Sequence, residues 1–250
     1  MNNPKQNFFL TKNNQKIHYK FINNKSLTTI IFLHGLMSDI KSKKAKHLKN
    51  FVNKNKINLL LFEYSGHGRS SGKFTDFSIK NWVEDSRSII KKLIKKNKIV
   101  LIGSSMGAWI AVILIKYFYK RIKGFIAISP APNFTEELIW KKLNDVEKSK
   151  IKKDKIYKLK SSHNNFYPIT KKFIFDGKKI LVLNKKILCN FPVELLHSIK
   201  DSSVSWVYSI KLIKTLISKK LSLTIIDDGD HSLSRAQDLK KLDLAIKNII

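Results

Sequence analysis

The sequence has little cysteine, little arginine and no long apolar run. Its one cysteine, Cys189, cannot form an internal disulfide, which is typical of a protein from a reducing compartment. No apolar stretch approaches the roughly 18 residues that a membrane-spanning helix needs. Residues 1–11 are polar and lack the apolar core of an export signal. We therefore expect a cytoplasmic protein without a transmembrane segment.

Acidic residues are also scarce, because 18 Asp and Glu stand against 49 Lys and Arg and the formal net charge is +31 at pH 7. Such a surface attracts polyanions at low salt. Arginine, whose forked guanidinium is favoured for recognising phosphates and bases, accounts for only four of these cations. The lysines are spread over every predicted helix and accompany abundant Asn and Ile, which indicates a general compositional bias. We therefore expect no specific nucleic-acid partner, and only a weak attraction to acidic surfaces.

What is present is a regular alternation of apolar strands and amphipathic helices. The 250 residues are 43% hydrophobic, which suits one large domain with a core on both faces of a sheet. Because the strands after the first two are almost continuously apolar, the pattern predicts an α/β fold with a mostly parallel sheet, an antiparallel start and helices on both faces. Strands are predicted at residues 8–11, 16–22, 28–33, 57–63, 98–103, 124–129, 192–197 and 221–226, and helices at about 43–54, 78–96, 106–119, 204–218 and 234–249.

The sequence Gly103-Ser104-Ser105-Met106-Gly107 fits the pattern GxSxG where the strand at 98–103 runs into the helix at 106–119. Such a strand–turn–helix is a nucleophile elbow, in which the serine adopts a strained backbone that lifts its hydroxyl clear of the sheet. Glycines two residues to either side remove side chains that would collide in the turn. Ser105 is therefore the candidate nucleophile.

An acid and a base follow in places that suit this chemistry. Asp201 comes shortly after the strand at 192–197, and His231 follows the strand at 221–226 and an acidic turn. Because parallel strands meet with their carboxyl ends at one edge of the sheet, both side chains are expected near Ser105. A serine activated by a histidine that a carboxylate orients performs nucleophilic acyl transfer. We predict Ser105, Asp201 and His231 as the catalytic residues, in this chain order.

The end of the strand at 28–33 predicts an oxyanion hole. The strand runs into His34-Gly35-Leu36-Met37, where glycine lets the backbone approach a substrate carbonyl. The backbone amides of Leu36 and Met106 are expected to donate together to the negative charge that develops on the carbonyl oxygen.

The other chemistry-bearing residues have weaker cases. Asp227, Asp228 and Asp230 precede His231 too closely to face its far nitrogen, and we expect them to bind backbone amides in their turn. The sequence shows no metal-ligand spacing, no GxGxxG and no P-loop, so we expect no metal and no cofactor. The remaining histidines are expected in packing, bracing or solvated positions: His18, His34, His47, His67, His163 and His197.

Between residues 133 and 176 the pattern changes to short, lysine-rich pieces. We interpret this segment as a small helical cap inserted into a single domain of residues 1–250. Its apolar side chains either line a ligand pocket or anchor the cap to the core, and the sequence favours neither alternative. These side chains are Phe134, Leu138, Ile139, Trp140, Ile156, Tyr157, Phe166 and Tyr167.

Together these motifs resemble the α/β-hydrolase superfamily, and more closely the abhydrolase-domain protein ten group. That group comprises the mitochondrial palmitoyl-protein thioesterase, also called mycophenolic acid acyl-glucuronide esterase, and bacterial relatives. The resemblance places the nucleophile, acid and base on Ser105, Asp201 and His231, and it implies hydrolysis of acyl esters or thioesters. The pattern departs at Ser198, where such proteins commonly have glycine. The likeness is carried by residues 32–35, 38–39, 44–45, 63–72, 103–109, 191–206 and 228–235.

The sequence as a whole predicts a cofactor-independent serine hydrolase that cleaves a carboxylic ester or acyl thioester of a small molecule or an acylated protein. Two other functions stay open at this stage. The same three residues suit an amide bond, so a serine peptidase is one alternative. The other is a binding protein that keeps the hydrolase fold without catalysis.

Overall fold

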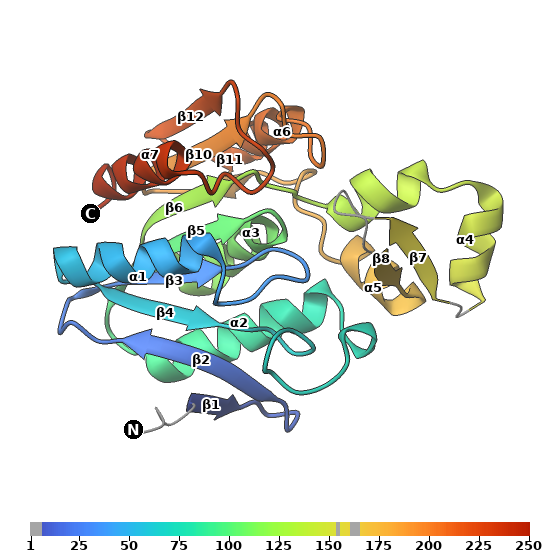
Figure 1. Cartoon of the computed structure of the whole chain (residues 1–250), viewed down its shortest axis with the longest axis horizontal. Helices are drawn as coiled ribbons and strands as arrows, with labels where there is room; N and C mark the ends of the chain where they lie inside the picture. The colour runs from blue at the N-terminus through green and yellow to red at the C-terminus, as the bar shows by residue number, and fades with distance from the viewer. Residues whose placement is uncertain (1–6, 154–155, 161–165) are drawn as a thin grey trace.

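The computed structural model of the protein describes residues 7–153, 156–160 and 166–250. Eight strands form one sheet in the order β1-β2-β4-β3-β5-β6-β10-β12 (Figure 1). β2 pairs antiparallel with both β1 and β4, whereas the other pairings in this sheet are parallel. The predicted α/β fold, with its antiparallel start, is therefore confirmed. The strands are β1 (Asn7–Leu10), β2 (Lys16–Ile22), β3 (Thr28–Leu33), β4 (Asn58–Phe62), β5 (Lys98–Ser104), β6 (Ile122–Ile128), β10 (Val193–Ser198) and β12 (Leu221–Ile226).

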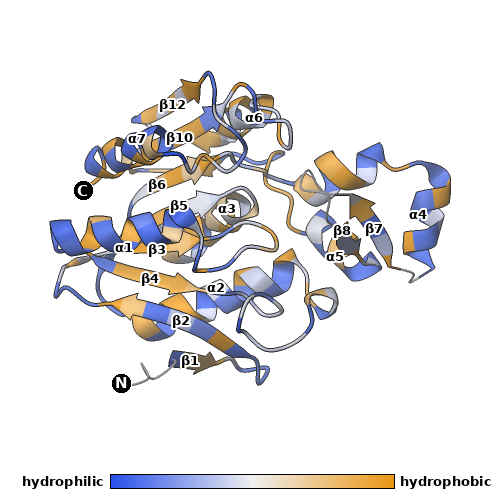
Figure 2. Cartoon of the chain, viewed as in Figure 1, coloured by the Kyte–Doolittle hydropathy of each residue, from blue (hydrophilic) through white to orange (hydrophobic). Residues whose placement is uncertain are grey.

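Helices cover both faces of this sheet, because alternate residues along each strand point to opposite sides. On one face α1 and α7 share a core with Ile30 and Phe32 of β3. On the other face α2, α3 and α6 share a core with Ile31 and Leu33 of the same strand. Figure 2 shows β4 and β6 mostly in the hydrophobic colour, whereas α1 and α7 carry both hydrophobic and hydrophilic residues. The helices are α1 (Lys43–Asn55), α2 (Ile79–Leu93), α3 (Met106–Phe118), α6 (Val207–Thr215) and α7 (Ala236–Lys247).

The helix predicted to reach residue 218 ends earlier, as α6 ends at Thr215. The next two residues form β11 (Leu216–Ile217), which pairs in parallel with β9 (Ile187–Leu188). The carbonyl of Ile217 also accepts a hydrogen bond from the amide of Cys189 (2.8 Å). The helix stops because these backbone groups find partners outside it. Two-residue strands are too short to show a period in the sequence.

The segment between β6 and β10 projects beyond the sheet (Figure 1). It contains the predicted short helical pieces and also an antiparallel hairpin of β7 and β8, which the sequence did not predict. His163 lies outside the described residues, as do the rest of 161–165 and residues 154–155. The elements here are a π-helical turn (Thr135–Ile139), a 3₁₀ turn (Trp140–Lys142), α4 (Asp145–Lys152), β7 (Tyr157–Lys160), β8 (Phe166–Ile169) and α5 (Lys171–Lys178).

Aromatic contacts attach this segment to the main core. The ring of Phe134 packs edge-on against Trp109 of α3, with centroids 5.7 Å apart, and lies 5.8 Å from Phe173 of α5. Phe173 in turn contacts Trp82 of α2 at 5.9 Å. For Phe134, these contacts favour the anchoring alternative over the pocket-lining one. By contrast, Phe166 of β8 is 57% exposed and takes no part in this anchor.

The start of α3 lies very close to neighbouring backbone. A Cβ atom built on Gly107 would lie 1.9 Å from the carbonyl oxygen of Leu33, and one built on Gly103 would lie 2.5 Å from the backbone of Ala108. Both distances are far shorter than real Cβ contacts, so both positions require glycine. This close approach holds the ends of β3 and β5 against the first turn of α3.

Two buried histidines lie at the carboxyl end of the sheet. His34 follows β3 and His67 follows β4, and their ring centroids are 5.3 Å apart. Tyr64 packs against His34, and Trp82 packs against His67. Burial lowers the pKa of His34 to about 4. Burial, together with the neighbouring His34, lowers the pKa of His67 to about 3. Both rings are therefore neutral at neutral pH.

Replacing Gly107 by Ala is expected to lower the free energy of unfolding by about 1–3 kcal/mol, because the added methyl group forces α3 away from Leu33. Gly35→Ala is the matched control. A Cβ atom on Gly35 would meet its neighbours at 3.5 Å, an ordinary contact, so its unfolding free energy is expected to stay within about 1 kcal/mol of wild type. Denaturant titration measures both values. Equal stability of the two variants would contradict the close packing described here.

Replacing His67 by Phe is expected to reduce the loss of stability on acidification. The pKa of folded His67 lies below the unfolded value, so its contribution is fully present above about pH 6.5 and is lost as the pH falls, because the unfolded chain then binds the extra proton. From about pH 7 to pH 5, wild type is expected to lose roughly 2 kcal/mol more than the variant. Burial raises the pKa of Asp85 to about 6, which makes the folded state more stable as the pH falls. This effect is the same in wild type and variant, so it cancels in the comparison.

The measurement is a pair of urea titrations of each protein, one at either end of that pH range. His47→Phe serves as the control, because His47 is half-buried at the surface and hydrogen-bonds Asp243. Equal losses in wild type and His67→Phe would show that His67 accepts a proton without unfolding and that its burial imposes no such cost.

Candidate active site

Ser105 lies in the turn between β5 and α3, where the sequence predicted it. Its backbone has φ 54° and ψ −116°. A positive φ is rare for a residue with a side chain and costs about 1–3 kcal/mol. Three backbone hydrogen bonds hold this conformation. The amide of Ser105 donates to the carbonyl of Ile128 (2.9 Å), and its carbonyl accepts from the amides of Ala108 (3.0 Å) and Ala131 (3.2 Å). This is the strained geometry that a GxSxG turn requires.

Asp201 and His231 converge on Ser105. Asp201 follows β10 and His231 follows β12, and β10 lies between β6 and β12 in the parallel part of the sheet. Both loops therefore emerge at the carboxyl edge that carries Ser105. His231 Nε2 lies 3.0 Å from Ser105 Oγ, and His231 Nδ1 lies 2.6 Å from Asp201 Oδ2. The structure thus joins the three predicted side chains in one hydrogen-bonded series.

The side chain of Asp201 is fully buried yet ionised. Burial alone would raise the pKa of this carboxyl group, but hydrogen bonds from His197 and His231 outweigh burial and hold the pKa well below its usual range. An ionised carboxylate can only accept, so His231 Nδ1 carries the hydrogen and donates it. Nε2 of the neutral imidazole is then free to accept the hydrogen of the Ser105 hydroxyl.

The predicted oxyanion donors lie on the two backbone segments that meet at the start of α3. Met106 is the first residue of α3, where amides have no acceptor within the helix and the helix dipole favours negative charge. Within the described residues, neither the Met106 amide nor the Leu36 amide has a hydrogen-bond partner. Gly35 lies beside Ser105, since a Cβ atom built on it would be 3.5 Å from Ser105 Cβ. Two donors are thus available next to Ser105.

The turn that carries Leu36 is fixed by its histidine. The ring nitrogen His34 Nδ1 lies 2.8 Å from the carbonyl oxygen of Gly35. The hydroxyl of Tyr64 donates to the carbonyl of His34 (3.2 Å). This agrees with the bracing position expected for His34.

The loop that carries His231 is held by a buried lysine that the sequence did not single out. Lys44 of α1 is only 7% exposed. Its Nζ donates to the carbonyl of Ser232 and to the hydroxyl of Ser234 (3.2 Å). Burial lowers the pKa of Lys44 to about 8, although the nearby carboxylates of Asp230 and Asp238 favour its charged form. Lys44 lies in a segment that carries the family likeness, but nothing in its spacing predicted a contact with the His231 loop.

Two acidic side chains of the turn before His231 bind groups within the same loop and at the start of α7. Asp230 Oδ1 accepts from the amide of Leu233 (2.9 Å), as expected. Asp228 differs from the expectation, because its carboxylate forms a two-pronged pair with the guanidinium of Arg235 (2.8 and 2.9 Å). The pairing of an aspartate with an arginine seven residues later was not visible as a sequence pattern.

Ser198, where the resembled group commonly has glycine, fits its position without a positive φ. Its hydroxyl donates to the carbonyl of Gly229 and accepts from the amide of Lys200 (3.1 Å). The serine therefore ties the turn before Asp201 to the turn before His231.

The sequence analysis missed one histidine that contacts the candidate site. His197, at the end of β10, has Nε2 only 3.2 Å from Asp201 Oδ2. A histidine four residues before the acid, on the strand that presents it, is the signal that would have pointed to this contact. Two others form carboxylate pairs elsewhere, His18 with Glu63 (2.9 Å) and His47 with Asp243 (2.6 Å).

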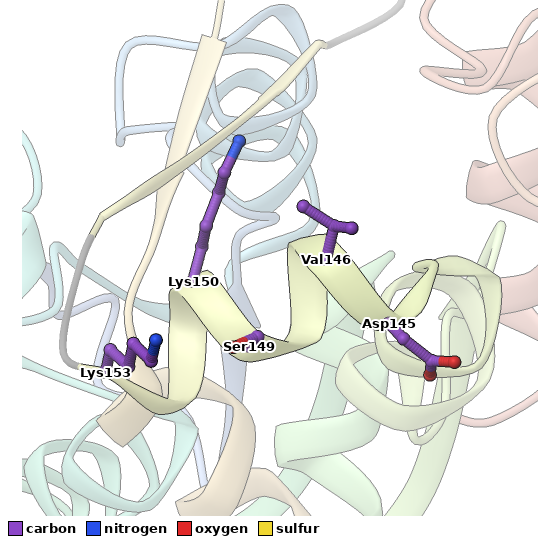
Figure 3. Close-up of a pocket in the computed structure, with 5 residues that line it drawn as sticks. All are labelled: Asp145, Val146, Ser149, Lys150 and Lys153. Atoms are coloured by element: carbon purple, nitrogen blue, oxygen red, sulfur yellow. The ribbon is translucent and has the colours of Figure 1, made fainter.

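Other features of the structure lie apart from this site. In the described part of the chain, no group of three or more His, Cys, Asp or Glu residues is arranged to hold a metal ion, and no helix is long and apolar enough to span a membrane. A cavity of about 440 Å³ lies along α4 (Figure 3). Its lining comes from that one helix and its end, so it contains none of the three predicted catalytic side chains. The lining residues are Asp145, Val146, Ser149, Lys150 and Lys153.

Known proteins resemble this chain in sequence and in fold. Residues 24–167 match the Hydrolase_4 family, described as serine aminopeptidase, S33. The rat protein named palmitoyl-protein thioesterase ABHD10, mitochondrial, is 26% identical over 223 residues, which cover 88% of this chain and 74% of the relative. A crystal structure of a hydrolase from Agrobacterium vitis S4 has a TM-score of 0.93 at 29% identity and covers 98% of each chain. Mouse alpha/beta hydrolase domain-containing protein 10 shares the fold, with a TM-score of 0.88 at 24% identity over 98% of this chain and 97% of that one.

The family match spans more than half of the chain, and the relatives are named as thioesterases and hydrolases. The resemblance predicted from the sequence motifs is confirmed, as is the prediction of a hydrolytic enzyme. The chain belongs to the serine aminopeptidase S33 family of α/β-hydrolases.

Proposed function

We propose that this hydrolase cleaves carboxylic esters or acyl thioesters through an acyl-enzyme formed on Ser105. One observation carries the proposal. The Ser105 hydroxyl, the His231 imidazole and the buried Asp201 carboxylate form a continuous hydrogen-bonded series at 3.0 and 2.6 Å. A hydroxyl is a weak nucleophile at neutral pH unless a base accepts its proton, and this geometry supplies that base.

In the first half of the reaction, Ser105 Oγ attacks the acyl carbonyl while His231 Nε2 takes its proton. Asp201 holds the imidazole in the tautomer that can accept and stabilises the imidazolium that forms. The amides of Leu36 and Met106 donate to the carbonyl oxygen as it becomes negative. The imidazolium then protonates the departing alkoxide or thiolate, and the acyl group stays on Ser105.

The second half reverses these roles with water. His231 removes a proton from a water molecule, which attacks the acyl carbon. The tetrahedral intermediate collapses, Ser105 regains its proton from the imidazolium, and the carboxylic acid leaves. No cofactor is needed for either half, because proton transfer and charge stabilisation come from the chain itself.

The relatives support the substrate class. The mammalian ones are named palmitoyl-protein thioesterases, so we place an acylated protein or a small acyl ester or thioester among the substrates. We also propose that residues 133–176 form a cap within a single domain of residues 1–250. The segment follows β6, and loops that follow parallel strands emerge at the edge of the sheet where Ser105 lies, which supports this proposal. The cytoplasm remains our proposed location, whereas the names of the mammalian relatives place those proteins in mitochondria.

Ser105→Ala is expected to abolish turnover and covalent labelling by a fluorophosphonate probe, because both need the same nucleophile. Turnover is measured on p-nitrophenyl esters of graded chain length, on an S-palmitoyl peptide and on an aminoacyl p-nitroanilide. The esters and the thioester are expected to be cleaved faster than the anilide.

Ser104→Ala is the matched control, since Ser104 is the adjacent buried serine. It is expected to keep both labelling and turnover. Labelling that survives Ser105→Ala but disappears in Ser104→Ala would show that Ser104 is the nucleophile and would contradict the proposal. Turnover of the anilide alone would make the enzyme a peptidase.

Asp201→Asn is expected to lower kcat by on the order of 10⁴ without unfolding the protein, because the amide no longer stabilises the tautomer that accepts the Ser105 proton. Asp227→Asn is the control, since Asp227 is an exposed acid in the turn before His231, and it is expected to keep kcat within about twofold. Steady-state kinetics on one ester decides the matter. Similar rates for the two variants would assign the acid to another residue.

A further inference from the structure

His197 is a fully buried histidine that the mechanism above does not use. It is the fifth residue of β10 and its side chain has no exposed surface. Its Nε2 lies 3.2 Å from Asp201 Oδ2 and 2.9 Å from the carbonyl oxygen of Val204. Its Nδ1 lies 2.7 Å from the hydroxyl oxygen of Ser209 on α6.

These contacts determine which nitrogen carries the hydrogen. Both groups that face Nε2, an ionised carboxylate and a backbone carbonyl, can only accept. Nε2 therefore carries the hydrogen and shares it between Asp201 and Val204. Nδ1 of the neutral ring then accepts from the hydroxyl of Ser209. Both nitrogens of His197 are satisfied in one protonation state, so the ring is locked as a donor toward Asp201.

Asp201 consequently accepts hydrogen bonds at both oxygens. Oδ2 receives His231 Nδ1 (2.6 Å) and His197 Nε2 (3.2 Å). Oδ1 receives the amides of Ser203 and Val204, both at 2.9 Å. A carboxylate has about four acceptor positions, so this one is filled and cannot rotate without losing a donor.

We propose that His197 is a positioning residue for the reaction, which fixes the Asp201 carboxylate and limits how strongly that carboxylate binds the His231 imidazolium. The inference rests on the proposed function, because it assigns the role through Asp201 and His231. The Oδ2 charge is divided between two imidazoles, only one of which exchanges protons with substrate. Because Oδ2 is shared, it stabilises the His231 imidazolium less, and His231 can pass its proton to the leaving group.

The direction of the effect follows from this division. Without His197, Oδ2 interacts with His231 alone, the imidazolium is stabilised, and the base becomes protonated at higher pH. Asp201 is the charged group that contacts His197, while α6 and the acid loop present the neutral Ser209 and Val204. His231 is linked to it through Asp201. The acid limb of the kcat/KM profile is therefore expected to move to higher pH.

The test compares three variants with wild type. His197→Leu removes the donor and is expected to lower kcat about tenfold and to shift the acid limb upward by about half a pH unit. His197→Gln keeps an amide N–H near the position of Nε2 and is expected to restore most of kcat and the wild-type acid limb. His47→Leu is the control, because it removes a histidine that hydrogen-bonds Asp243 outside the site, and its profile is expected to match wild type.

The outcomes separate this inference from the proposed function. If wild type is neither labelled by the fluorophosphonate nor active on the esters, the proposed function fails and the role of His197 fails with it. If wild type is labelled and active but His197→Leu keeps kcat and the acid limb unchanged, the inference alone is overturned. A His197→Gln variant no better than His197→Leu also overturns it, because the donor is then not what matters.

A second measurement covers the case in which His197→Leu does not fold. Nitrogen-15 NMR of histidine-labelled wild type is expected to show His197 protonated at Nε2 and unprotonated at Nδ1 throughout the active pH range. A ring protonated at Nδ1, or a cationic ring in that range, contradicts the locked donor and overturns the inference.

Discussion

The strained backbone of Ser105 is the constraint on which the rest of the site depends. A positive φ at a serine costs free energy that contacts within the turn do not offset. The surrounding structure therefore has to offset this strain. Two apolar cores, one on each face of the sheet, provide that stability. The three hydrogen bonds that hold Ser105 come from the end of β6, from α3 and from the segment that leads away from β6. Tertiary structure therefore holds Ser105 in place, while Gly103 and Gly107 only make the conformation sterically possible.

Ion pairs and hydrogen bonds to charged side chains fix the loops around Ser105, although the chain is strongly basic. The chain has only 18 acidic side chains beside 49 basic ones, yet several acids concentrate at this edge of the sheet. Asp201 is saturated with donors, and Arg235 is paired with Asp228 and Asp238. Lys44 is the complementary case, a cation withdrawn from solvent to hold the loop that follows His231. Loops have no ladder of backbone hydrogen bonds, so such contacts supply the rigidity that strands obtain from pairing.

The sequence predicted the sheet and the three side chains that meet at its edge, because both depend on local patterns. Apolar runs reveal the strands, and Ser105, Asp201 and His231 each follow the end of one. The contact of Lys44 with the His231 loop was not predictable, since it joins distant parts of the chain; Lys44 and Ser232 are 188 residues apart. The contact of His197 with Asp201 is local, at four residues, and was missed although its spacing could have indicated it. The hairpin of β7 and β8 was missed because four-residue strands show almost no period. The cap aromatics were ambiguous because anchoring a segment and lining a pocket require the same side chains, and only the packing of Phe134 on Trp109 distinguished the two for that residue.

The order of the strands along the chain also determines when the parts of the site are synthesised during translation. Ser105 and His231 are 126 residues apart in the chain, and a ribosome releases the N-terminal part first. The Ser105 hydroxyl is therefore synthesised long before the imidazole that hydrogen-bonds to it. Among the described strands of this sheet, β12 comes last in the chain and lies at the edge, where it pairs only with β10. Under the proposed function, a nascent polypeptide therefore cannot react with acyl groups until this edge strand has docked on the sheet.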